Sequence, residues 1–133
     1  MILDDIADFL TTGAIATKGT NLFLGDRTPD TPDEVVMIRL TQGLPSLRTM
    51  GNTVGQANLD MPRIQVEVRS TTYVLADTLA RSVRGALDNL PPTTINGTVY
   101  RHIEALQSEP LSIGMDDNRR HSMVLNFQVR KDR

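Results

Sequence analysis

The most constraining feature of the sequence is a strand pattern that runs directly into a helix pattern. In "MPRIQVEVR" (Met61–Arg69) apolar and polar residues alternate, which is typical of a β-strand with one buried face. From Ser70 to Leu90 apolar residues recur at helical spacing, and two prolines end the pattern. The buried stripe predicted for this helix consists of Leu75, Leu79, Val83, Ala86, Leu87 and Leu90. Because strand and helix each have one apolar face, we expect them to pack together.

Weaker patterns complete an α+β fold. A short amphipathic helix is predicted at the N-terminus, with Asp4, Asp5 and Asp8 on its exposed face. Asn96-Gly97 is a strong signal for a two-residue hairpin turn. Further strands are predicted at Leu22–Leu24, Val35–Leu40, Thr98–Gln107 and His121–Arg130. The sequence thus predicts one domain over residues 1–133, a mixed, mainly antiparallel sheet packed against one long and one short helix.

Composition excludes several classes of protein. The 14 basic and 16 acidic residues give a net charge of −2, whereas a free-standing nucleic-acid binder usually has a basic excess. The chain has no cysteine, so disulfides and thiolate chemistry are excluded. Its first residues, "MILDDIADFL", carry acids where a signal peptide needs positive charge, and no apolar run is long enough to cross a membrane. We therefore expect no export signal and no membrane partner.

A charged cluster, "MDDNRRH", lies just before the last predicted strand. It contains Asp116, Asp117, Arg119 and Arg120. Polar residues between two extended segments indicate the tip of a hairpin, where the charges are solvated. In an oligomer the same charges could instead form ion pairs with a neighbouring subunit.

The longest stretch without periodicity is Gln42–Asp60. It has three glycines and only two charged residues, but it retains scattered aliphatic side chains. Loops of this length are uncommon in a compact domain, and a disordered loop would normally carry more charge. We therefore expect it to become ordered against a partner, although an ordinary mobile loop is the alternative. The candidate contact residues are Leu44, Leu47, Arg48, Met50 and Val54.

Catalytic motifs are not evident. The sequence contains no glycine-rich phosphate loop and no Gly-x-Ser-x-Gly motif. His102 and His121 lie on strands expected to pair, so a metal site with Glu104 or Asp117 is conceivable, but a cross-strand polar pair is the favoured interpretation. We predict no enzymatic activity, no cofactor and no metal.

Several segments together resemble the bacteriophage minor capsid proteins of the tail-terminator type. The opening "ILDDIADFL" is followed by "LFLGDRTPDTPDEVVMI" and by "MPRIQVEVRSTTYVLADTLARSVRGALDNL". In that family a Pro-Arg-[apolar]-Gln strand runs into the main helix, and "INGTxY" then leads to "QSEPxSIGxDDNxR" and a final strand. The corresponding segment here is "INGTVYRHIEALQSEPLSIGMDDNRRHSMVLNFQV". The resemblance covers nearly the whole chain and is weakest at Gln42–Asp60.

The resemblance implies a tail-terminator-like fold and a structural role in the virion. Such proteins form rings, commonly of six copies, that cap the tail tube at the head–tail junction and meet the head connector or stopper protein. Assembly would take place in the host cytoplasm, and DNA would pass through the ring without sequence-specific binding. The alternatives are another neck or tail subunit, such as a head–tail stopper or tail-completion protein, and a small α+β binding module unrelated to phages.

Overall fold

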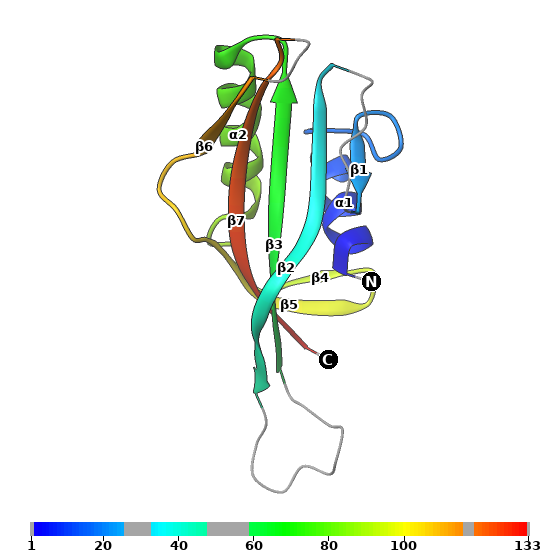
Figure 1. Cartoon of the computed structure of the whole chain (residues 1–133). Coiled ribbons are helices and arrows are strands. Elements are labelled where there is room, and N and C mark those ends of the chain that lie inside the picture. Colours follow the sequence, from blue (N-terminus) through cyan, green and yellow to red (C-terminus); the bar gives the residue numbers. More distant parts are fainter. Residues whose placement is uncertain (1, 26–32, 48–58, 116–118, 133) are drawn as a thin grey trace, which may run out of the picture.

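The computed structural model describes residues 2–25, 33–47, 59–115 and 119–132, and for residues 42 and 44–47 it describes the backbone alone. Two helices and seven strands follow one another along the chain (Figure 1). They are α1 (Ile2–Thr12), β1 (Leu22–Leu24), β2 (Val35–Leu47), β3 (Leu59–Ser70), α2 (Tyr73–Leu87), β4 (Thr93–Ile95), β5 (Thr98–Ala105), β6 (Leu111–Met115) and β7 (His121–Asp132). No described helix is long and apolar enough to span a membrane.

All the described strands belong to one sheet. Its order is β1-β2-β3-β7-β5-β4, and β6 also pairs with β7. Only the β1–β2 pair is parallel. Strand β7 has β3 along one side, and β5 and β6 follow each other along its other side, because they pair with different parts of β7. The predicted mixed, mainly antiparallel sheet is confirmed.

Both helices cover the same face of the sheet (Figure 1). Register places Val66 of β3 beside Ile38 of β2 and Leu125 of β7, and all three side chains are fully buried. These residues belong to one core cluster that also includes residues of α1 and α2. The expected packing of Met61–Arg69 against the following helix is therefore confirmed.

Helix α2 is shorter than predicted, and its predicted stripe is confirmed except at Leu75. Val83 and Leu87 are buried, and Leu79, Ala86 and Leu90 pack against the core. The Thr72 hydroxyl accepts a hydrogen bond from Leu75 N at 3.2 Å, so the helix begins after this N-cap and not at Ser70. Leu75 is 50% exposed. The buried positions are Ala76, Ala80, Val83 and Leu87. Small alanines let the helix lie close to the sheet. With 11 residues in α1 and 15 in α2, both helices are short, and the expected contrast of one long and one short helix is not confirmed.

One acid of α1 is buried, contrary to expectation. Asp5 is only 6% exposed, and its Oδ2 accepts a hydrogen bond of 2.5 Å from the Tyr100 hydroxyl. The Asn96 amide donates to Asp5 Oδ1 at 3.0 Å and to Asp8 Oδ2 at 2.9 Å. Burial and the bond to Asp5 raise the pKa of the Tyr100 phenol above its ordinary value. These bonds join α1 to the β4–β5 hairpin.

The Asn96-Gly97 turn is confirmed as a two-residue hairpin. Ile95 of β4 pairs with Thr98 of β5, and the two turn residues have φ of 51° and 81°. Positive φ at both positions matches the twist of adjacent strands, and asparagine and glycine adopt it most readily.

Part of the predicted long loop is strand. β2 continues to Leu47 and β3 begins at Leu59, so the two strands form an arm that extends beyond the helices (Figure 1). Their register shifts twice, between Thr41 and Leu44 and again between Leu44 and Leu47. The loop prediction is therefore wrong for residues 42–47 and 59–60, and residues 48–58 lie outside the described residues.

Candidate interaction site

The charged cluster connects two antiparallel strands, as predicted for a hairpin. Met115 at the end of β6 pairs with His121 at the start of β7. The first arm is β6, whereas Thr98–Gln107 was expected to provide it. Asp116 and Asp117 lie outside the described residues. Arg119 is exposed and has a φ of 59°.

Arg120 is not a solvated tip residue. Its side chain is 5% exposed, and Nη1 lies 3.4 Å from Asp33 Oδ1. Arg69 also reaches this acid, donating from Nε to the Asp33 backbone oxygen at 3.3 Å. Arg120 therefore ties the base of the hairpin to the segment before β2, and the expectation that all the tip charges are solvated is wrong here. Sequence reasoning missed Asp33, which is 87 positions away from Arg120.

Polar side chains form a ladder across the sheet face opposite the helices. Arg39 Nη2 lies 3.2 Å from Glu67 Oε2, and Arg39 Nη1 lies 3.4 Å from Gln65 Oε1. Gln65 Nε2 donates to Asn126 Oδ1 at 3.3 Å, and Asn126 donates to Gln107 Oε1 at 3.0 Å. The ladder crosses β2, β3 and β7, so it fixes the register of these strands on the polar side.

The Pro-Arg-Ile-Gln segment of β3 has a structural role. Arg63 Nε donates to Gln128 Oε1 at 2.8 Å. Gln128 is 2% exposed, and its amide nitrogen lies 3.1 Å from the backbone oxygens of Met61 and Pro62. Because Pro62 has no N–H, it cannot donate to a neighbouring strand. The Gln128 side-chain amide instead donates hydrogen bonds to the Met61 and Pro62 carbonyl oxygens of β3.

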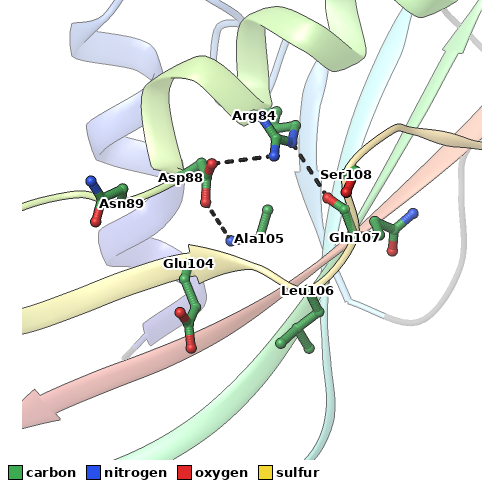
Figure 2. A pocket seen from close by; sticks show the side chains of 8 residues that line it. All are labelled: Arg84, Asp88, Asn89, Glu104, Ala105, Leu106, Gln107 and Ser108. Carbon is green, nitrogen blue, oxygen red and sulfur yellow. Dashed lines mark hydrogen bonds and ion pairs between the residues drawn. The ribbon is translucent and has the colours of Figure 1, made fainter.

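The Gln-Ser-Glu-Pro segment is held by α2. An open hollow of about 280 Å³ lies between the end of α2 and the segment after β5. Figure 2 shows the side chains that line it. Asp88 Oδ1 accepts a hydrogen bond of 2.8 Å from Ala105 N, and Asp88 Oδ2 lies 3.3 Å from Arg84 Nη2. Arg84 Nε in turn donates to the Gln107 backbone oxygen at 3.4 Å. Arg81 forms ion pairs with Glu109 and Asp77. Arg84 and Asp88 are therefore engaged within the hollow, whereas Asn89 and Glu104 bind His102 and Arg130 outside it.

The two histidines lie apart. His102 pairs with Arg130, at the other end of β7 from His121. His102 Nε2 is 3.1 Å from Asn89 Oδ1, whereas His121 makes an edge contact with the Tyr73 ring at 5.9 Å. The cross-strand arrangement considered for these residues is therefore wrong. Among the described residues, no group of three His, Asp or Glu side chains could hold a metal ion.

Exposed apolar side chains occur on both faces of β6, which sequence reasoning did not foresee. By register, Met115 lies on the helix side with His121, whereas Leu111 pairs with Val124 and lies on the opposite face. Leu111, Ile113 and Met115 of β6 are each more than half exposed. Their alternation resembles that of a buried strand, so periodicity alone gave no sign of their exposure. At the start of α2, Tyr73, Val74 and Leu75 are exposed as well, and Tyr73 is linked to β6 through His121.

The described fold is an α+β sheet with two helices on one face and an exposed apolar strand, β6, at one margin. The family model of the bacteriophage tail terminator proteins matches residues 7–133, and the chain belongs to this family. It is thus a structural protein of the phage tail and virion. No match was found among curated protein sequences.

Two solved structures share the fold. One is a chain in the virion of a native gene transfer agent particle, with a TM-score of 0.68 and 12% identity over 99% of this chain and 95% of that one. The other has a TM-score of 0.55 and 14% identity over 96% of this chain and 89% of its own. At such low identity these likenesses support the architecture and not a partner or a site.

Proposed function

We propose that the protein forms a closed ring of identical copies, commonly six, at the head-proximal end of the tail. The observation that carries this proposal is the family match over residues 7–133, which includes all seven strands and α2. The ring stops polymerisation of the tail-tube protein and presents its other side to the head connector or stopper protein. It assembles in the host cytoplasm and remains at the head–tail junction of the virion.

The contacts within this ring and with the tail tube are assigned to two regions. The first is the distal end of the β2–β3 arm, with Leu44 and Leu47 on β2. Arg48, Met50 and Val54 continue this region beyond the described residues. The second is the charged hairpin, with Asp116, Asp117 and the exposed Arg119. Arg120 supports this hairpin from within through Asp33.

DNA passes through the ring without being held. The net charge is −2, so the chain as a whole does not attract a polyanion. On the open face of the sheet, Arg39 is paired with Glu67 and Arg63 with Gln128. Cations already engaged in this way offer little to phosphate groups, which suits a channel through which DNA must slide.

Tail length tests the proposal. Phage tails assembled without this protein should be irregular in length by electron microscopy, and adding the purified protein should restore one length. Tails of one length in its absence would contradict the proposed role.

Replacing residues 48–58 with a short Gly-Ser linker should weaken capping while leaving the melting temperature within a few degrees of the parent.

A further inference from the structure

The strands at the margins of the sheet differ in how they are protected. Natural sheets shield an edge by keeping it short, charged, or covered. β4 has three residues and follows two prolines, and β1 has three residues with Lys18 bridged to Leu22 on its outer side. β6 is different, because its five residues, Leu-Ser-Ile-Gly-Met, are all exposed and none is charged.

A second unprotected edge lies on the opposite margin. β1 pairs with β2 only from Val36 to Ile38, and Gly25 N donates to Ile38 O at 3.1 Å. Beyond Ile38, β2 continues to Leu47, and no strand among the described residues pairs with its outer edge. Leu40, on the helix-side face of this stretch, is 50% exposed.

The two free edges fit each other in direction. β6 is antiparallel to β7, β7 to β3, and β3 to β2, so β6 and β2 run in opposite directions at opposite margins. A second copy turned about an axis to which the strands are tilted brings its β2 beside β6 of the first copy in antiparallel orientation. Such a head-to-tail contact joins two different surfaces and closes a ring when the rotation closes.

We propose that the outer edge of β6 pairs with the outer edge of β2, beyond Ile38, in the next copy of the chain. This inference rests on the proposed ring and identifies its subunit contact. Main-chain hydrogen bonds supply the pairing, as in other cases of β-strand addition. The pairing covers Met115 together with Leu40 of the neighbour on the helix side of the sheet, and Leu111 on the opposite face.

The offset between the two edges suits a closed sheet. β6 lies level with Val35–Met37 of β2 through β7 and β3, whereas the free part of β2 begins at Arg39. Strands in a closed sheet tilt against its axis and are staggered from one margin to the other. The offset is therefore expected of neighbours in a ring.

Other occupants fit β6 less well. DNA needs cations, and β6 has none. Two β6 strands could pair antiparallel with each other, but this symmetric contact uses the same surface on both copies and produces a pair, not a ring. In the β6–β2 contact one copy keeps its free β2 edge and the other keeps its free β6 edge, so the contact can be repeated.

Cysteine cross-linking tests the contact without interference, because the chain has no cysteine of its own. Ser112 of β6 and Leu40 of β2 are both exposed and, by register with Met123 and Ile64, both lie on the helix side of the sheet. We would assemble tails with the double variant Ser112→Cys/Leu40→Cys and treat them with a short bifunctional maleimide. The controls are the two single variants and Ser112→Cys/Thr94→Cys, which places the second thiol on the exposed Thr94 of β4.

The double variant Ser112→Cys/Leu40→Cys should give a ladder of covalent multiples of the 14.7 kDa chain, and the three controls should remain monomeric in the denaturing gel. A dimer from Ser112→Cys alone would overturn the proposal in favour of a β6–β6 pair. Capped tails of normal length without a ladder would overturn the β6–β2 contact and leave the terminator function standing. If the unmodified chain does not join tail ends at all, the proposed function fails as well.

Discussion

The hydroxyl of Tyr100 donates a hydrogen bond of 2.5 Å to the carboxylate of Asp5, and both side chains are buried between α1 and β5. The two residues are 95 positions apart, so this contact joins the N-terminal helix to the second half of the sheet. A buried carboxylate is costly unless hydrogen bonds compensate for lost hydration. Tyr100 and Asn96 provide them here.

Replacing Tyr100 with phenylalanine should therefore destabilise the fold. The variant keeps the ring in the core but leaves Asp5 Oδ2 without its phenolic donor, which should cost about 1–3 kcal/mol in the free energy of unfolding. Tyr73→Phe is the matched control, because Tyr73 is exposed. Urea denaturation of both variants measures the difference. Equal stability of the two would show that the Tyr100–Asp5 bond contributes nothing net.

The same pair predicts loss of stability at high pH. The pKa of Tyr100 is raised in the folded state above the ordinary value of 10.0, so the folded chain retains the phenolic proton more tightly than the unfolded chain. The resulting stabilisation is complete below pH 10.0 and declines as pH rises above it towards the folded pKa. In a Tyr73→Phe background only Tyr100 can form tyrosinate. Its absorbance should appear together with unfolding, and ionisation of a still-folded chain near pH 10 would contradict this account.

Two glycines should respond in opposite directions to alanine. A Cβ at Gly43 would lie 2.7 Å from Met61 O and 2.8 Å from Pro62 Cα, both backbone atoms of the facing strand. Gly43→Ala should therefore separate β2 from β3 in the arm and cost roughly 1–3 kcal/mol. Gly85 lies inside α2 with no atom within 4 Å of the added group, and Gly85→Ala should stabilise by about 0.5–1 kcal/mol. Thermal melting of the two variants checks the signs, and a stabilised Gly43→Ala would refute the close contact.

The sheet-and-helix core is tested by placing an acid at Val66. This side chain is fully buried at the centre of the sheet. Val66→Asp should lower stability by several kcal/mol, because it buries a charge without a partner. Val74→Asp, in the exposed first turn of α2, should have little effect. Circular dichroism melting compares them, and similar melting temperatures would mean that Val66 is not in the core.

Local patterns predicted much of this fold. The alternation of Met61–Arg69, the helix that follows and the Asn96-Gly97 turn are each specified by neighbouring residues, and each is confirmed. The arm was missed because β2 shifts register on both sides of Leu44. Each bulge adds residues to one strand and interrupts the period of two, so Gln42–Leu47 does not alternate.

The candidate site was harder to predict, because its contacts are distant in sequence. Arg120 was expected to be solvated from its place in a charged turn, but Asp33 binds it from the far end of the chain. Asp5 was likewise assigned to the exposed face of α1, because its partners Asn96 and Tyr100 are distant in sequence. Conversely, Leu111, Ile113 and Met115 have the pattern of a buried strand, yet all three are exposed on β6, which has no described neighbour along its outer edge.

Electron cryo-microscopy of tails assembled with the purified protein tests the central proposal most directly. The account predicts a closed ring of identical copies at one end of the tail tube, with the sheets side by side around a central channel. Density for the chain along the tube wall, or a single copy at the tube end, would contradict it.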